Sequence, residues 1–302
     1  MTADRAIRML VKEGLLRRQR GVGTFVLAKK ERLRIGIMGM EQRKFLYERD
    51  YVFTVNTFPI IKTELSKFNA VLVEISDDDQ IEKLKLDGLL LGSSPPKEKR
   101  LQIPSANYRS YQLLNRPMIQ CVPDLENVFN QLFDYFRRRE IRNYHIFSAT
   151  WSNIKYFADF FCDKALEFGI KKSDLKVSIS DFEKNENVYN FGYQYGKALE
   201  DIEHSVVFST SDFRSVGILQ ALDERGYKPG DYELVSCNNW EAYGYKPFTH
   251  PRLTSIDFRR EDCLRKCVEM LCQCAEGKFG DSIPLLKVPA FIKIRESAMQ
   301  HK

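Results

Sequence analysis

The stretch Ser205–Cys237, SVVFSTSDFRSVGILQALDERGYKPGDYELVSC, is the clearest guide to the fold. Ser205–Ser209 and Glu233–Cys237 are typical of strands, and Phe213–Arg225 between them has the apolar spacing of a helix. Two strands joined by a crossover helix form a parallel unit. This stretch therefore predicts an α/β fold.

The same alternation of strands and helices extends from Leu33 to the end of the chain. Repeated strand–helix units predict parallel sheets with helices on both faces. About 270 residues suit two such doubly wound sheets, and we expect the two sheets to meet at a cleft. Further expected strands are Arg34–Met38, Ala70–Ile75, Asp87–Gly92 and Tyr144–Phe147, and further expected helices are Phe53–Phe68, Asp124–Arg139, Asn153–Phe168, Val188–Asp201 and Arg260–Glu276.

The first 34 residues have a different composition. They hold ten Lys/Arg and three acids, whereas the rest of the chain holds 37 basic and 38 acidic residues. Thr2–Leu16 predicts a helix with Thr2 as N-cap. Two short strand-like runs follow it around the basic, glycine-rich tip Arg20–Gly23, which predicts a hairpin. A basic helix and hairpin suit phosphate contacts on DNA, although a solvated basic tail would have the same composition.

The remaining signals exclude several classes of protein. None of the apolar runs reaches the ~18 residues that span a bilayer, and none of the common hydrolase or metalloprotease motifs occurs. We therefore expect no enzyme activity, no cofactor and no membrane partner. The seven Cys favour a reducing, cytoplasmic compartment. Four of them, Cys263, Cys267, Cys272 and Cys274, share one predicted helix and cannot surround a tetrahedral metal ion.

The head resembles the second half of a GntR-type winged helix-turn-helix. The matching segments are Thr2–Leu10, Glu13–Leu16 and the wing signature Gly21–Val26. The resemblance implies a partial DNA-binding domain over residues 1–32. Because that family has two more helices before this one, we expect either a true start upstream of Met1 or weak DNA binding. The expected DNA-facing residues are Thr2, Arg5, Arg18, Gln19, Arg20, Gly21 and Gly23.

Residues 33–302 resemble the effector-binding domain of LacI-type regulators, which is shaped like a periplasmic sugar-binding protein. The resemblance is carried by Leu86–Leu91, Val122–Asn127, Phe208–Asp212, Glu224–Asp231 and Pro251–Ile256. Together with the wing signature, these motifs resemble those of GntR–LacI hybrid repressors. The resemblance implies two lobes, the first about 33–143 and 257–285, the second about 144–256 and 286–302. The stretch between Ile75 and Asp87 is shorter than in the family, which puts one first-lobe helix in question.

The resemblance also implies ligand-binding positions, each with a structural alternative. Asp124 matches an acid that accepts sugar hydroxyls and equally suits a helix N-cap. Phe182 matches an aromatic that stacks on the ligand, and an aromatic before a helix is otherwise usually a hydrophobic staple. Asp212 follows a position where Ser211 replaces the family's Asn, and its alternative role is to stabilise the turn from strand to helix. Asn238 replaces an Asp. Trp151 could add a ring against a sugar face. The family's pocket Arg should fall near Phe157 and is missing, so we expect a less charged, more apolar pocket.

These observations predict a cytoplasmic transcriptional regulator, most simply a repressor. It would sense a small ligand, a carbohydrate or a derivative, and bind a two-fold symmetric DNA operator as a homodimer. The alternative is a stand-alone small-molecule-binding or dimerisation protein whose head does not function.

Overall fold

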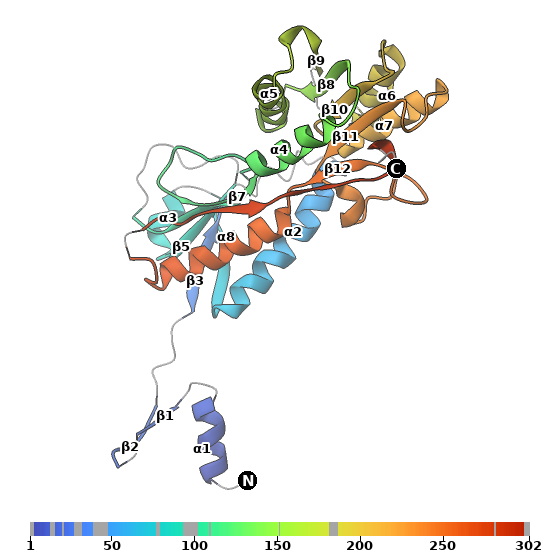
Figure 1. Cartoon of the computed structure of the whole chain (residues 1–302). Coiled ribbons are helices and arrows are strands. Elements are labelled where there is room, and N and C mark those ends of the chain that lie inside the picture. Colours follow the sequence, from blue (N-terminus) through green and yellow to red (C-terminus); the bar gives the residue numbers. More distant parts are fainter. Residues whose placement is uncertain are drawn as a thin grey trace.

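The computed structural model describes residues 3–12, 16–19, 21–26, 32–38, 48–76, 79–92, 102–108, 110–150, 152–180, 187–280 and 282–298. Two six-stranded sheets form two lobes (Figure 1). All strand pairs in these sheets are parallel except one, which confirms the predicted α/β class with two parallel sheets. None of the helices in these ranges is long and apolar enough to cross a bilayer.

The sheet of the first lobe has the strand order β13-β7-β6-β5-β3-β4. Its central strand β5 is buried on both faces, as its unbroken apolar sequence indicates. Leu90 joins the core beneath α2 and α8, whereas Leu89 and Leu91 face the other side, where α3 has only five residues. The elements are β3 (Leu33–Ile37), α2 (Glu48–Lys67), β4 (Ala70–Glu74), α3 (Asp79–Lys83), β5 (Gly88–Leu91), β6 (Ser105–Asn107), β7 (Ile119–Asp124), α8 (Arg260–Ala275) and β13 (Leu285–Pro289).

The sheet of the second lobe has the order β14-β12-β11-β10-β8-β9. Helices α4 and α5 cover one face, and α6 and α7 cover the other. The elements are α4 (Leu125–Phe136), β8 (Asn143–Ala149), α5 (Ser152–Glu167), η2 (Lys172–Asp174), β9 (Leu175–Ser180), α6 (Val188–Ala198), β10 (Ser205–Ser209), α7 (Asp212–Glu224), β11 (Tyr232–Cys237), η3 (Trp240–Tyr243), β12 (Thr254–Asp257), β14 (Phe291–Lys293) and η4 (Glu296–Ala298).

An aromatic core fills the space between α4, α5 and the second sheet. Phe129 meets Phe208 edge-on, and Phe161 stacks on Phe208 with ring centroids 4.4 Å apart. Phe133 and Phe136 of α4 lie in the same core and are almost fully buried. Burial of a large apolar side chain stabilises a fold by about 1.5–3 kcal/mol, so this core fixes α4 firmly to the second lobe.

Three neighbouring chain segments connect the lobes. The first runs from β7 into α4, the second from β12 into α8, and the third from β13 into β14. The third lies beside both others, because Pro289 pairs with Asp124 and Phe291 pairs with Asp257. The lobe boundaries expected from the sequence put α4 in the first lobe and β13 in the second. In the structure, α4 packs in the core of the second lobe, and β13 pairs with β7 in the sheet of the first lobe. Both elements lie next to a connecting segment, where a boundary is easily misplaced.

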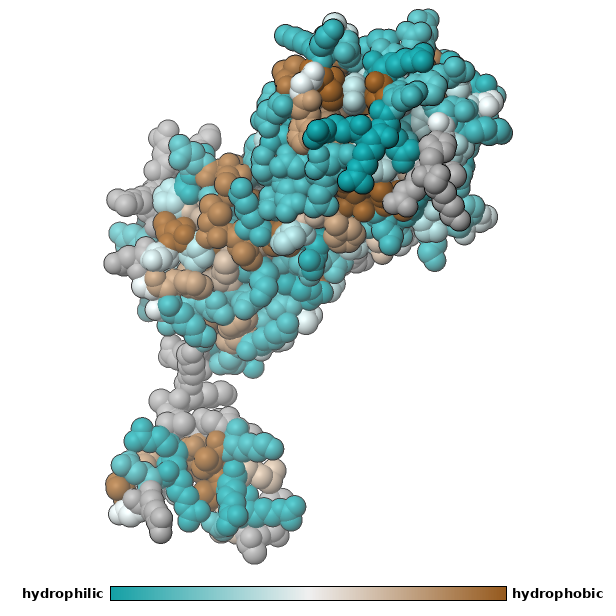
Figure 2. Space-filling view, in the orientation of Figure 1, coloured by the Kyte–Doolittle hydropathy of each residue, from teal (hydrophilic) through white to brown (hydrophobic). Residues whose placement is uncertain are grey.

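The head forms a separate small unit at the N-terminal end (Figure 1). Helix α1 (Ala3–Lys12) is followed by an antiparallel hairpin of β1 (Leu16–Gln19) and β2 (Gly23–Val26). Gly21 has φ +78°, which glycine adopts readily at a tight tip. None of the described α1 residues is buried, and apolar surface remains open in the middle of the head (Figure 2).

Candidate ligand pocket and DNA-facing head

An aromatic cluster fills the space where the two lobes meet beside the connecting segments. Tyr111 extends from the loop after β6 in the first lobe and contacts Phe157 of α5 edge-on, with ring centroids 5.0 Å apart. Phe258, just after β12, stacks on Phe157 at 4.7 Å and meets Tyr111 at 5.6 Å. Phe157 and Phe258 are almost fully buried. Tyr111 therefore closes the first lobe against the core of the second.

Polar contacts accompany this aromatic closure. The Tyr111 hydroxyl donates to Oδ1 of Asn238, which lies beyond β11 in the second lobe, at 3.4 Å. The guanidinium of Arg260, the first residue of α8, lies 4.7 Å from the Tyr111 ring centroid and 5.1 Å from that of Trp240. Each cation–π contact of this kind contributes about 0.5–2 kcal/mol. Arg260 thus links a first-lobe ring to a second-lobe ring.

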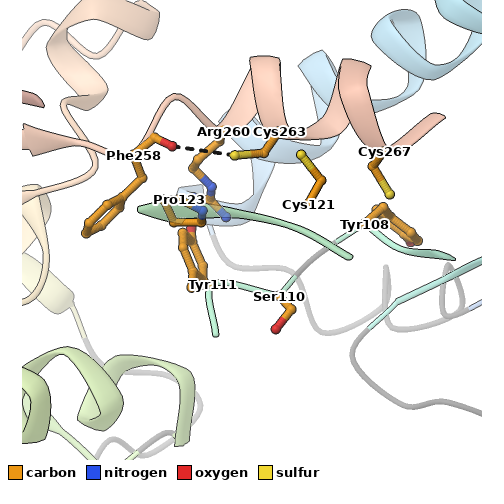
Figure 3. A pocket seen from close by; sticks show the side chains of 9 residues that line it. All are labelled: Tyr108, Ser110, Tyr111, Cys121, Pro123, Phe258, Arg260, Cys263 and Cys267. Atoms are coloured by element: carbon orange, nitrogen blue, oxygen red, sulfur yellow. Dashed lines mark hydrogen bonds between the residues drawn. The ribbon is translucent and has the colours of Figure 1, made fainter. Parts of the chain in front are cut away.

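A cavity of about 350 Å³, including its open mouth, lies next to this cluster on the first-lobe side (Figure 3). The ends of β6 and β7, the segment after β12 and the first two turns of α8 form its wall. Of its nine lining residues, all within the described ranges, only Arg260 carries a charge. Tyr108, Ser110 and Tyr111 supply hydroxyl groups. The wall of the cavity is therefore mostly apolar, and Arg260 is the one charged side chain among these lining residues.

Asp212 lies at the start of α7, away from this cavity and completely buried. Its Oδ1 accepts a hydrogen bond from the Ser255 hydroxyl at 2.8 Å, and its Oδ2 accepts one from the Trp240 backbone N–H at 2.6 Å. Burial raises the pKa of Asp212 to about 6. In this arrangement its carboxylate connects α7 to the segments after β11 and within β12, which is the turn-stabilising alternative considered from the sequence.

Asn238 and Asn239 form the turn after β11. Both have positive φ, 95° and 52°, a backbone region that Asn tolerates better than most residues. Asn239 is buried, donates to Oδ2 of Asp257 at 2.8 Å and accepts from Arg295 at 2.6 Å. Asn238 is partly exposed and contacts Tyr111, so it lies at the junction of the lobes.

Of the other three predicted ligand-binding positions, only Asp124 lies within the described residues. Asp124 ends β7 and accepts a hydrogen bond from the Asn127 backbone N–H at 3.3 Å, which makes it the N-cap of α4. Trp151 and Phe182 lie outside the described residues. Of the predicted positions that the structure describes, Asp124, Asp212 and Asn238, none lines the cavity.

Sequence patterns offered little indication of the residues that do line the cavity. The missing family Arg pointed to Phe157, and the structure shows why an apolar ring suits that position: it packs between Tyr111 and Phe258. Tyr111 itself belongs to no motif, because its position depends on the path of a loop. Arg260 looked like an ordinary charged residue at the start of a helix.

Three thiols, those of Cys121, Cys263 and Cys267, also line the cavity. A contact with the Cys121 thiol, together with burial, raises the pKa of Cys263 well above its usual range, and burial does the same for Cys267. Thiols with raised pKa values are poor nucleophiles and poor metal ligands. Within the described ranges, groups of three or more His, Cys, Asp or Glu arranged to hold a metal ion are absent.

The head places its predicted DNA-facing residues on exposed surface wherever they are described. Arg5, Gln19, Gly21 and Gly23 are exposed, whereas Thr2 and Arg20 lie outside the described residues. The exposed Arg18 donates to Oδ1 of Asp4 at 2.7 Å and so ties the hairpin to α1. Asp4 also pairs with Arg8, and both contacts hold its pKa below the usual value.

Comparison with known proteins identifies the overall architecture. Residues 161–298 match the family model of the periplasmic binding protein-like domain. This part of the chain contains most of the second lobe, α8, and β13 and β14. Together with the rest of the chain, this part forms the two sheets and the three connecting segments described above. The fold is that of a two-lobed periplasmic-binding-protein-like domain.

Solved structures of LacI-family regulators share this periplasmic-binding-protein-like fold over nearly their whole length. A LacI-family protein from Enterococcus faecium with bound ribose has a TM-score of 0.65 at 16% identity, covering 89% of this chain and 100% of that chain. A putative LacI-family regulator from Rhizobium etli has a TM-score of 0.64 at 18% identity, covering 88% and 98%. The lac repressor dimer bound to operator and the anti-inducer ONPF has a TM-score of 0.64 at 13% identity, covering 90% and 96%. No match was found among curated proteins.

Proposed function

We propose that this protein is a sugar-sensing transcriptional regulator, and specifically a repressor. The observation that carries the proposal is the attachment of a basic helix and hairpin to a two-lobed domain whose lobes are joined by three connecting segments. Such lobes can close around a ligand, and closure can reorient an attached DNA-reading head. A cytoplasmic homodimer on a two-fold operator would use two such heads.

The sugar part of the proposal draws on the fold and the pocket. Two solved structures with this fold contain ribose and D-xylulofuranose. The cavity next to Tyr111 lies beside the junction of the two lobes. Its hydroxyl-bearing side chains provide partners for a polyhydroxylated molecule.

The DNA part of the proposal rests on the head. A GntR-type winged helix would place α1 in the major groove and the hairpin along the backbone. Arg5 and Arg17 are exposed on these two elements, where they can meet phosphates. Each phosphate contact adds about one unit to the slope of log K against log salt concentration.

Fluorescence anisotropy with DNA fragments that flank the protein's own gene tests this function. We expect tight, salt-dependent binding that changes when the effector is added. Arg5→Ala should weaken binding about tenfold and lower the salt slope by about one. Arg137→Ala, which removes the same charge from the exposed C-cap position of α4, is the matched control and should have no effect. Equal losses in both variants, or binding that does not depend on salt, would contradict specific DNA recognition by the head.

One observation favours a second candidate, a ligand-binding or dimerisation protein whose head does not read DNA. None of the described residues of α1 is buried, and Leu10, Val11 and Phe25 are more than a third exposed. A helix with an uncovered apolar face is poorly fixed. This candidate predicts stabilisation by a sugar without any DNA binding by the full chain.

A further inference from the structure

Asp4, in the first turn of α1, holds two arginines of the head with one carboxylate. Its Oδ1 accepts a hydrogen bond from Nη1 of Arg18 in β1 at 2.7 Å. Its Oδ2 accepts one from Nε of Arg8, one turn further along α1, at 2.9 Å, and Nη2 of the same guanidinium lies 2.6 Å from it. The hydrogen bonds from Arg18 and Arg8 hold the pKa of Asp4 below its usual value, so the carboxylate stays charged at neutral pH. Two guanidinium groups around one carboxylate leave an excess of positive charge.

This cluster lies on the surface of the head. The exposed fractions are 77% for the Arg8 side chain, 56% for Arg18 and 47% for Asp4. Ion pairs at such exposure contribute little to the stability of a fold. They do restrict a long arginine side chain, which otherwise samples many rotamers. The main consequence of the cluster is therefore the position of the two guanidinium groups.

The contact with Asp4 leaves one edge of the Arg8 guanidinium open. Arginine presents its N–H donors as a planar fork. The Nε and Nη2 side of the fork faces Asp4, and the contacts that Arg8 makes within the described residues are all with that carboxylate. The edge formed by Nη1 and the second N–H of Nη2 is thus turned away from Asp4. It offers two N–H groups side by side to a ligand outside the head.

Two parallel donors at this position match one base of DNA. In the major groove guanine presents two acceptors, N7 and O6, whereas adenine pairs its N7 acceptor with an N6 donor and cytosine presents an N4 donor. Arg8 belongs to α1, the helix that the proposed function places in the major groove. Arg18 belongs to the hairpin, which would follow the sugar-phosphate backbone. The geometry therefore favours a base contact for Arg8 and a phosphate contact for Arg18.

We propose that Arg8 reads a guanine in the major groove and that Asp4 is the positioning residue that holds the Arg8 guanidinium for this contact. Nη1 and Nη2 of Arg8 donate to O6 and N7 of the guanine. A guanidinium that is already held in place loses less conformational freedom when it binds. The proposal rests on the DNA-binding function proposed above and adds the base that the head recognises.

Selection of DNA duplexes from a random library by the full chain, at fixed salt concentration, tests the base contact. We expect the wild type to enrich a sequence with a fixed guanine that Arg8→Ala does not enrich. Alanine is a good helix former, so α1 should persist in this variant. Lys12→Ala is the matched control, because it removes the same charge from the exposed last turn of α1. It should lower affinity and keep the guanine, and loss of the guanine in this variant too would overturn the proposal.

A change of one atom in the DNA tests the contact more closely. Replacement of the selected guanine by 7-deazaguanine removes the N7 acceptor and keeps the base pair. In fluorescence anisotropy the wild type should bind the 7-deaza duplex about tenfold more weakly. Arg8→Ala should bind the two duplexes equally. An equal loss in the wild type and in Arg8→Ala would show that another residue contacts the guanine and would contradict the proposal.

Asp4→Asn tests the positioning role. The variant lacks a negative charge near the DNA phosphates, so it should bind duplexes of random sequence more tightly than the wild type. Its preference for guanine over 7-deazaguanine should fall severalfold, because the Arg8 guanidinium is no longer held. A merely structural role of Asp4 would weaken binding of all duplexes alike, and this outcome would overturn the positioning role.

The results for the wild type separate this inference from the proposed function. Salt-dependent DNA binding with the same selected sequence in the wild type and Arg8→Ala would overturn the inference and support DNA binding by the head. Failure of the wild type to bind any duplex of the library would overturn both.

Discussion

Asp212 is unusual because its side chain is completely buried and its carboxylate accepts hydrogen bonds from Ser255 and Trp240. Burial raises its pKa from 3.8 to about 6. The folded state therefore binds more protons than the unfolded state between about pH 4 and pH 6. Its contribution to the free energy of unfolding is fully present below about pH 4 and is lost as the pH rises through 6, by about 3 kcal/mol.

Urea unfolding of the wild type and Asp212→Asn at pH 4 to 7 measures this contribution. We expect the variant to be less stable at pH 4, because its amide cannot accept from the Trp240 N–H in addition to the Ser255 hydroxyl. It should also lack the loss of stability between pH 4 and 6 that Asp212 causes. Ser255→Ala is the control, since it removes one hydrogen bond and keeps the titrating group. Identical pH profiles for the wild type and Asp212→Asn would show that the carboxylate does not titrate in this range.

The cysteines provide a second prediction at the level of single residues. Burial raises the pKa of Cys162 to about 11 and that of Cys272 to about 12, and it also raises those of Cys237 and Cys267. We expect slow alkylation by iodoacetamide at pH 7.5 in the native protein, and all seven thiols to react in urea. Mass spectrometry of peptides should find the partly exposed Cys274 labelled first. Rapid labelling of Cys267 in the native protein would contradict its burial in the cavity wall.

At the level of elements, α6 and α7 pack backbone against backbone. A Cβ added to Gly192 would lie 1.9 Å from the Arg214 carbonyl oxygen, and one added to Gly217 would lie 2.2 Å from the Tyr189 carbonyl oxygen. Only glycine permits this approach. Outside the contact, the Tyr193 hydroxyl donates to Glu224 at 2.5 Å and fixes the register of the two helices.

Alanine at either glycine should therefore force the helices apart. We expect Gly192→Ala and Gly217→Ala to lower the free energy of unfolding by about 1–3 kcal/mol or more. Gly277→Ala is the comparison, because its Cβ would meet nothing within 4 Å and only its positive φ of 76° opposes the change, at a cost of about 1 kcal/mol. Thermal denaturation followed by circular dichroism measures all three. An equal loss of stability in Gly277→Ala would mean that the close packing of α6 against α7 does not determine the loss in the other two variants.

The sequence predicted the central elements well and the marginal ones poorly. Strands β5, β10 and β11 are buried, so their apolar runs are continuous, and α7 has a clear helical period. Strand β9 was missed because it is mostly exposed and its sequence, LKVSIS, is half polar. Strand β6 has only three residues, and the edge strand β13 ends in a proline. Such strands depend on their neighbours more than on their own sequence.

At the level of the whole molecule, Tyr111 holds the lobes together. Tyr111→Ala removes ring contacts with Phe157 and Phe258 and the hydroxyl contact with Asn238. Aromatic pairs contribute about 0.5–1.5 kcal/mol each, so the variant should lose about 1–3 kcal/mol. Its radius of gyration in small-angle X-ray scattering should rise as the lobes separate.

Tyr111→Phe is the matched variant for this experiment. It keeps the ring contacts and loses one hydrogen bond, which costs about 0.5–1.5 kcal/mol. We expect a radius of gyration close to that of the wild type. An unchanged radius in Tyr111→Ala would show that other contacts keep the lobes closed.

The two-lobed architecture followed from the order of strands and helices, but the site did not. The motif that contains Asp212 correctly located the turn into α7, but the carboxylate of Asp212 is buried in the second lobe. Asp124 has the N-cap geometry that any helix start would favour. Tyr111 and Arg260 meet only because a loop of one sheet and the first turn of α8 converge, a long-range arrangement that no local pattern contains.

The second connecting segment, which runs from β12 into α8, both lines the cavity and joins the two lobes. Phe258 and Arg260, which are two positions apart, belong both to the wall of the cavity and to the backbone that passes from one lobe to the other. A ligand in the cavity would therefore contact this connecting segment directly. Such a contact would need no chain of side chains through the interior of either lobe. A different ligand would then directly change the angle between the lobes.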